Sequence, residues 1–105
     1  MYRDTYYEIC TIICTKMFNY IKERVRASVN VRVEDNILRI KIVTREGFDF
    51  VYEVGNFIES VMEGFNTELI GAACLAQYKK AILMKYFKHW KLTINWFRSP
   101  LRRKL

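Results

Sequence analysis

The sequence predicts an α+β domain of two layers, in which helices cover one face of a three-stranded antiparallel meander. Three observations lead to this prediction. Apolar residues recur with helical spacing over residues 4–27, alternate with polar residues over residues 28–54, and return to helical spacing from residue 67 onward. A chain of 105 residues has the size of one domain. We therefore expect the order α-β-β-β-α-α within a single domain, residues 1–98, and a basic tail over residues 99–105.

The first predicted helix begins at Asp4, a residue type that caps helix N-termini, and runs to about Ala27. At 100° per residue, nine mostly apolar side chains fall on one half of it: Tyr6, Ile9, Cys10, Ile13, Cys14, Met17, Phe18, Ile21 and Val25. The polar half is expected to face water. Cys10 and Cys14 lie one turn apart on the apolar half without metal-ligand spacing, which favours buried thiols in a reducing cytoplasm.

The alternating segment predicts a meander whose register is set by its first turn. Asp35 and Asn36 both tolerate a positive φ and suit a two-residue hairpin turn. That turn places three apolar pairs opposite one another: Val33 and Leu38, Val31 and Ile40, and Val29 and Ile42. After a second turn at residues 45–47, the same face continues in a third strand with Phe48, Phe50, Tyr52 and Val54.

The other face of the predicted sheet comprises Asn30, Arg32, Arg39, Lys41, Asp49, Val51 and Glu53, and its charged residues are of both signs. A sheet that is apolar on one side and charged on the other is covered by helices on one side only. Because the signs are mixed, we expect cross-strand ion pairs and a solvated face rather than a binding platform.

Two further helices are predicted after the sheet. Asn56 and Glu59 form a capping-box pattern that starts a short helix over residues 57–63. Asn66 or Thr67 then caps a long helix.

The long helix is expected to reach about Arg98, where Ser99-Pro100 stops it. Its length would be roughly 46 Å at ~1.5 Å per residue, so its end would project from the domain and expose Ile94, Trp96 and Phe97. A competing interpretation makes Leu92, Ile94 and Trp96 an alternating fourth strand.

Charge is concentrated at one end of the chain. Residues 79–105 hold nine Lys or Arg and no acid, residues 46–78 hold six acids and no base, and the net charge is +7. This distribution indicates an anionic partner. The candidate contacts are Lys80, Lys85, Lys88, Lys91, Arg98, Arg102, Arg103 and Lys104, with Trp90 and Trp96 as candidate stacking or anchoring residues.

Nothing in the sequence indicates catalysis, a cofactor or a metal. The single histidine, His89, has no carboxylate near it in the sequence, and no glycine-rich loop precedes a helix to hold phosphate. No apolar run approaches the ~18 residues that span a bilayer, and no signal peptide is evident, so we expect a cytoplasmic protein.

The predicted order of helix, three antiparallel strands and helix resembles double-stranded-RNA-binding domains over roughly residues 4–90. That resemblance implies RNA contacts through the first helix, a long loop between the first two strands and the start of the last helix. The chain departs from it: the Asp35-Asn36 turn is too short to be that loop, and Lys79-Lys80 lies within the last predicted helix.

The segments Tyr6-Tyr7-Glu8-Ile9-Cys10 and Tyr78-Lys79-Lys80-Ala81-Ile82-Leu83-Met84-Lys85-Tyr86-Phe87 look like those of small proteins encoded by phages and mobile elements of low-GC bacteria. The layout is similar to that of some type II anti-CRISPR proteins, which implies a dedicated binder that blocks or redirects a host machine. Those inhibitors are often acidic, whereas this chain is basic.

Two hypotheses follow. In the first, a non-catalytic phage-accessory protein binds nucleic acid or a nucleoprotein, such as a host defence effector, through its basic C-terminal helix and tail. In the second, the long C-terminal helix is a protein–protein interface of a homo-oligomer, for instance a dimer, and the charge serves solubility.

Overall fold

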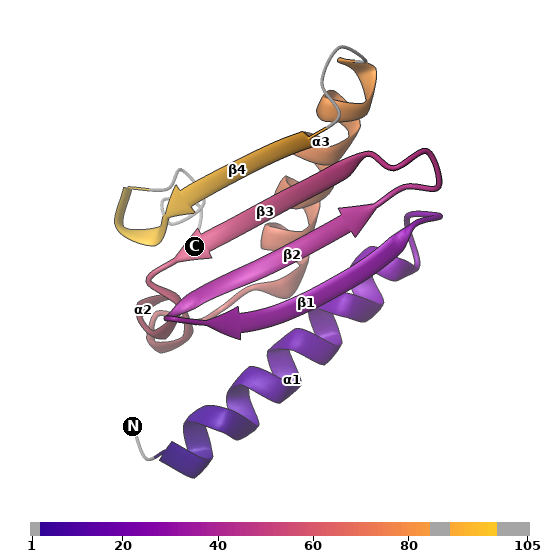
Figure 1. Ribbon diagram of the computed structural model, residues 1–105. Coiled ribbons are helices and arrows are strands. Elements are labelled where there is room, and N and C mark those ends of the chain that lie inside the picture. The colour runs from indigo at the N-terminus through magenta and orange to yellow at the C-terminus, as the bar shows by residue number, and fades with distance from the viewer. Residues whose placement is uncertain (1–2, 85–88, 99–105) are drawn as a thin grey trace.

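The computed structural model describes residues 3–84 and 89–98, and these form three α-helices, a four-stranded sheet and a 3-10 turn (Figure 1). The elements follow the order α1 (Arg3–Lys22), β1 (Ser28–Glu34), β2 (Ile37–Val43), β3 (Asp49–Gly55), α2 (Phe57–Met62), α3 (Thr67–Leu83), β4 (His89–Asn95) and η1 (Trp96–Arg98). The predicted α+β class and the single layer of helices are confirmed.

Strands β1, β2 and β3 form the predicted antiparallel meander, and its register agrees with the sequence pattern. Val33 pairs with Leu38, Val31 with Ile40 and Val29 with Ile42. Asp35 and Asn36 both adopt positive φ in the connecting turn, at 54° and 59°. The sheet is larger than expected, because β4 adds to the edge of β3 in parallel and makes a mixed sheet in the order β1-β2-β3-β4.

The prediction of one long helix to about Arg98 is wrong. Helix α3 ends at Leu83, and the competing strand interpretation is confirmed for Leu92 and Ile94 in β4, whereas Trp96 begins η1. Strand β4 places Leu92 opposite Tyr52 and Ile94 opposite Val54, so both apolar side chains join the buried face of the sheet. Burial of this surface favours the strand, because a projecting helix would have left it in water.

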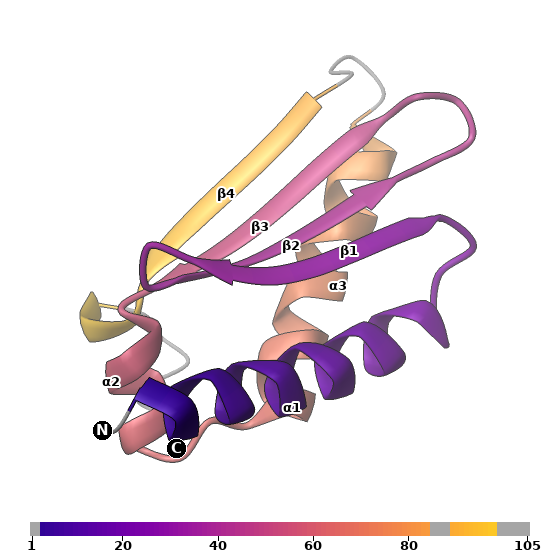
Figure 2. The same ribbon diagram turned by 60° about the horizontal axis from the view of Figure 1, so that its bottom comes forward.

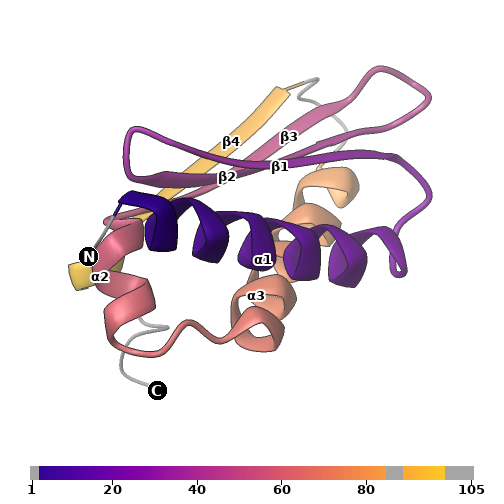
Figure 3. The same cartoon turned by 90° about the horizontal axis from the view of Figure 1, so that it is seen from below.

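All three α-helices lie on one side of the sheet, as the two rotated views show (Figures 2 and 3). The core between the layers holds Met17 and Ile21 from α1, Ile70 and Cys74 from α3, and the inward side chains of the strands. Helices α1 and α3 approach closely at Gly71, where an added Cβ would lie 2.5 Å from Cδ1 of Tyr20. Among the described residues, no helix combines the length and apolar character that crossing a membrane requires.

Helix α2 begins differently from the prediction. The side chain of Asn56 caps no helical amide, and the residue has φ 60°. Instead, Asn36 in the β1–β2 turn accepts two amide hydrogen bonds, from Ile58 to its Oδ1 at 2.7 Å and from Phe57 to its carbonyl at 3.0 Å. The capping box is therefore replaced by a cap from a turn twenty residues away in the chain.

The two longer helices agree with the sequence pattern only in part. Asp4, predicted to cap the first helix, lies within α1, which begins at Arg3. Asn66 caps α3 as expected, since its Oδ1 accepts from the amide of Leu69 at 2.9 Å. Helix α1 ends at Lys22 rather than near Ala27, and Ala27 is buried in the connection to β1.

Candidate functional site on the open face of the sheet

The α-helices all lie on one face of the sheet, and no described element covers the other, which we call the open face (Figures 1 and 3). Polar side chains occupy most of the open face. Strand alternation places on this face Ser28, Asn30, Arg32 and Glu34 of β1, Ile37, Arg39, Lys41 and Val43 of β2, Asp49, Val51, Glu53 and Gly55 of β3, and Lys91, Thr93 and Asn95 of β4. Side chains on this open face project from hydrogen-bonded strands, a rigid support of the kind that binding sites need.

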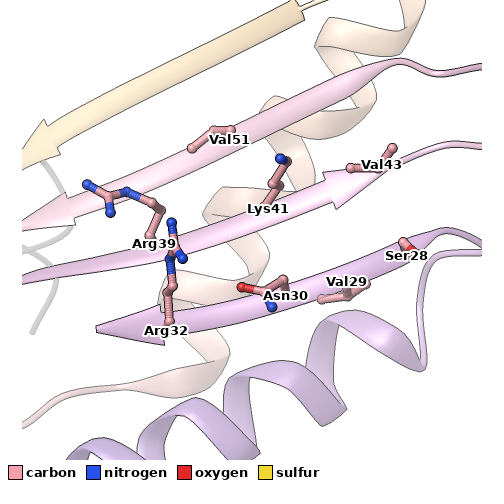
Figure 4. A pocket seen from close by; sticks show the side chains of 8 residues that line it. All are labelled: Ser28, Val29, Asn30, Arg32, Arg39, Lys41, Val43 and Val51. Atoms are coloured by element: carbon pink, nitrogen blue, oxygen red, sulfur yellow. The ribbon is translucent and has the colours of Figure 1, made fainter. Parts of the chain in front are cut away.

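A shallow hollow of about 460 Å³ lies on the open face (Figure 4), and we call it the sheet hollow. It is lined by Ser28, Val29, Asn30, Arg32, Arg39, Lys41, Val43 and Val51. Three of these side chains are cationic and none is acidic, so the hollow is more basic than the face as a whole.

Two of the three cations lie directly opposite each other, because Arg32 of β1 pairs with Arg39 of β2. In Figure 4 the Arg32 side chain extends across toward Arg39. Like charges at opposed positions of neighbouring strands destabilise a sheet. Glu34 offsets part of this repulsion, at 3.5 Å from Nε of Arg32 and 3.9 Å from a terminal nitrogen of Arg39.

The second carboxylate of this network, Glu53, is 3% exposed although it belongs to the open face. Its side chain is covered by its own partners: Arg39 donates to Oε2, Thr93 donates to Oε1 at 2.7 Å, and Nζ of Lys91 lies 3.2 Å from Oε1. Burial alone would raise the pKa of Glu53, but these donors outweigh it and lower the pKa to about 2. Glu53 thus stays ionised and holds Arg39 and Lys91 in place.

Lys41 completes the sheet hollow and differs from the two arginines. It is exposed, it lies opposite Asn30, and it forms no ion pair within the described ranges 3–84 and 89–98. Its ammonium group is therefore available to an anion from outside the protein.

A second hollow, of about 420 Å³, adjoins the first at the end of the sheet where α1 leads into β1, and we call it the end hollow. Its lining comprises Lys22, Arg26, Ala27, Ser28, Val43, Thr44 and Arg45. Ser28 and Val43 pair with each other and line both hollows, so the two hollows adjoin at this pair.

Together the sheet hollow and the end hollow form one basic surface. Six cations line it, Lys22, Arg26, Arg32, Arg39, Lys41 and Arg45, and no Asp or Glu is among the described residues that do so. Arg26 and Arg45, like Lys41, form no ion pair in the described part of the chain. Lys22 donates to the carbonyl of Ala27 at 2.6 Å, which fixes its ammonium beside the end hollow.

The site residues predicted from the sequence lie in different parts of the fold. Lys80 is exposed on α3, in the helix layer and away from the open face. Lys91 lies on the open face, where it pairs with Glu53. Trp96 is fully buried, and its Nε1 donates to Oε2 of Glu63 at 2.8 Å, which contradicts its assignment as an exposed stacking residue.

The other predicted site residues fall into two groups. Trp90 lies in β4 and Arg98 in η1, and only their backbone is described. Lys85, Lys88, Arg102, Arg103 and Lys104 lie outside the described residues.

The sequence analysis missed Lys22, Arg26 and Arg45, and it treated Arg32, Arg39 and Lys41 as part of a solvated face. A signal was present: the positions flanking the first and second strands are basic at Arg26 and Arg45, and the predicted register already placed them at the same end of the sheet. The prediction instead placed the binding surface at the C-terminal concentration of basic residues.

The cysteines fit the predicted role of apolar side chains. Cys74 is buried, and burial raises its pKa to about 12, so a thiolate is strongly disfavoured there. Cys14, half-buried, also has its pKa raised by burial.

No protein-family model matches this chain, and neither a curated protein nor a solved structure does.

Proposed function

We propose that this protein binds nucleic acid without catalysing a reaction, and that the basic surface contacts the phosphate backbone. One observation carries the proposal: six Lys or Arg side chains line two adjoining hollows, one on the open face of the sheet and one at the end of the sheet beside α1, and no carboxylate is among the described lining residues. A row of phosphates complements such a surface, and each phosphate neutralised by a cation releases condensed counterions and so favours binding.

The opposed pair Arg32 and Arg39 supports the same proposal. Like charges at facing positions do not stabilise a sheet. Glu53 and Glu34 compensate Arg39, whereas Arg32 has only the 3.5 Å contact with Glu34. A phosphate seated between the two groups would relieve their repulsion, since guanidinium forks bind phosphate oxygens in bidentate geometry. Departures from local stability rules of this kind are expected at functional sites.

In this proposal the C-terminal cations contribute less to binding than the sequence predicted. Lys85, Lys88, Arg102, Arg103 and Lys104 stay contacts predicted from the sequence. A phage-encoded accessory protein that engages a host nucleoprotein, such as a defence effector, is the biological setting that the sequence resemblance suggests for this binding.

The alternative of a homo-oligomer joined through a long C-terminal helix loses its structural basis. Helix α3 ends at Leu83, Trp96 is buried in its own chain, and Ile94 packs against the core. Of the three apolar groups assigned to that interface, Ile94 and Trp96 are thus used within the domain, and Phe97 is exposed.

The proposal is tested by fluorescence anisotropy with a labelled oligonucleotide, titrated at several salt concentrations. About five phosphate contacts predict a log–log slope of affinity against salt near −4 to −5. Lys41→Gln should weaken binding several-fold and make the slope shallower by about 0.9. Lys80→Gln, which removes the same charge from an exposed position in the helix layer, is the matched control and should bind as the unmodified protein does.

Three outcomes would reject the proposal. The first is no binding at low salt to any oligonucleotide tested, and the second is an affinity that salt does not change. The third is an equal loss in the Lys41 and Lys80 variants, which would show that only the net charge of the protein matters.

A further inference from the structure

The described side chains of the open face offer cations to a nucleic acid but no Phe, Tyr or Trp ring. The register adds one histidine position, His89 opposite Asp49, of which only the backbone is described. The aromatic side chains of β3, Phe50 and Tyr52, point the other way and are buried in the core. Proteins that bind single strands depend on aromatic side chains on which unpaired bases stack, and each such base is worth about 1–3 kcal/mol. The described side chains of this face do not supply that source of affinity.

The cations are also spread along the strands rather than gathered at one point. Arg32 and Arg39 form one group, Arg26 and Arg45 form another at the end of the sheet, and Lys41 lies between them. From Arg39 to Arg45 the chain spans about 20 Å at ~3.4 Å per residue. A duplex carries one negative charge per ~1.7 Å of its axis, whereas one strand carries one per ~3.4 Å. Over the same length a duplex therefore presents about twice the charge.

These cations also sit on a rigid support. Arg32, Arg39 and Lys41 project from hydrogen-bonded strands, and the Glu53 network fixes Arg39 further. A preorganised row of charges loses little conformational entropy on binding, and it gains most from a ligand whose phosphates are also held at fixed positions. A flexible single strand would have to be ordered at a cost that no stacking offsets here.

We infer that the ligand of the basic surface is double-stranded nucleic acid, held through its phosphates and with little dependence on base sequence. This inference rests on the proposed function and narrows it to one class of ligand.

The test compares a labelled 16-bp duplex with each of its separated strands, under one buffer and with DNA and RNA versions of the same sequence. The unmodified protein should bind at least one of the two duplexes about ten-fold more tightly than either component strand. With about five contacts, the salt slope should be near −4.5 for the duplex and near −3.5 for a strand. A second duplex of unrelated sequence should bind within about two-fold of the first.

The outcomes separate this inference from the proposed function. If single strands bind as tightly as the duplexes or more tightly, and Lys41→Gln still weakens that binding, the proposed function stands and the duplex inference is wrong. If no nucleic acid binds, both fail. A strong preference for one duplex sequence would overturn the backbone-only mode of contact.

A gain-of-function variant tests whether an aromatic side chain on the open face would favour single strands. Val51 is half-buried and lines the sheet hollow, so Val51→Tyr places an aromatic ring beside the cations. We expect single-strand affinity to rise several-fold while duplex affinity changes little. Val51→Leu is the matched control, with added bulk but no ring. An unchanged single-strand affinity in a folded Val51→Tyr protein would contradict the stacking argument.

Discussion

Trp96 and Glu63 join the end of β4 to the end of α2, through a 2.8 Å hydrogen bond from the indole Nε1 to Oε2. The indole is fully buried, and its only ring nitrogen therefore needs a partner that the chain itself supplies. The same joint includes a 2.6 Å hydrogen bond between the side chains of Asn56 and Asn95. The C-terminal strand is thus anchored by side chains as well as by its pairing with β3.

The anchor predicts a large effect of truncating the tryptophan. Trp96→Ala should lower the free energy of unfolding by about 3–5 kcal/mol, since it removes a buried aromatic side chain and leaves Glu63 without the indole. Chemical denaturation followed by circular dichroism measures the change. Phe97→Ala, at the neighbouring and exposed position, should cost much less. Similar losses at both positions would contradict the buried anchor.

The Glu53 network predicts a loss of stability in acid. The folded-state pKa of about 2 lies below the ordinary value of 4.5, so the contribution of Glu53 is complete above pH 4.5 and is lost as the pH falls toward 2. The difference corresponds to about 3 kcal/mol at most. Glu53→Gln should be less stable at pH 7 and should lose less stability between pH 5 and pH 2.5. Parallel pH profiles for the two proteins would refute this role.

The contact between α1 and α3 predicts an unusual response to a glycine substitution. In an open helical position Gly→Ala stabilises by about 1 kcal/mol. At Gly71 the added methyl would lie 2.5 Å from the Tyr20 ring, so we expect Gly71→Ala to destabilise by about 1–3 kcal/mol instead. Ala72→Gly, at the exposed neighbour, calibrates helix propensity and should cost about 1 kcal/mol. A melting temperature raised by Gly71→Ala would disprove the close approach.

The distant cap of α2 predicts an effect of Asn36 on a helix in another part of the chain. Asn36→Gly keeps the positive φ of the turn but removes the Oδ1 acceptor of the Ile58 amide, and it should cost about 1 kcal/mol. Asn36→Asp retains an acceptor and should stay close to the original stability. Hydrogen exchange at the Ile58 amide gives a local readout, which should accelerate in the glycine variant alone.

The end hollow predicts a pair of binding contacts that can be removed together. Arg26→Gln with Arg45→Gln should weaken nucleic-acid binding and flatten the salt slope by about 1.8, or 0.9 for each phosphate contact. The control is Lys79→Gln with Lys80→Gln, which removes two charges from exposed positions of α3. Anisotropy titrations at four salt concentrations measure both slopes, and a steeper loss in the α3 pair would place the contact in the helix layer.

Much of the fold could be predicted where local pattern and burial agree. Strict alternation and a two-residue turn leave a single register in which Val29, Val31 and Val33 all face the core, and the structure has that register. The α3 cap at Asn66 depends on its own next few residues and was predictable for the same reason.

Strand β4 could not be predicted because its residues fit two periods. Trp90, Ile94 and Phe97 recur with helical spacing, while Trp90, Leu92 and Ile94 alternate as in a strand. The choice depends on the free edge of β3, which lies about forty residues earlier in the chain. The Asn36 cap escaped prediction for a related reason, because the donor and acceptor belong to separate elements.

The candidate site was likewise predictable only in those features that depend on neighbouring residues in the sequence. The residue types of the open face followed from alternation, but the separation of its charges did not. Glu53 is withdrawn from the surface only because Thr93 and Lys91, contributed by β4, close over it together with Arg39. When β4 is left out of account, acidic and basic side chains are mixed over the open face, and its basic part cannot be recognised.

The parallel pairing of β4 has a consequence for synthesis of the chain. While the protein emerges from the ribosome, β1, β2 and β3 can pair as neighbours in succession, but the outer edge of β3 has no partner until residues up to Asn95 have appeared. An unpaired edge beside an apolar face is prone to join other chains. The nascent protein is therefore most exposed to aggregation in the interval between completion of β3 and arrival of β4.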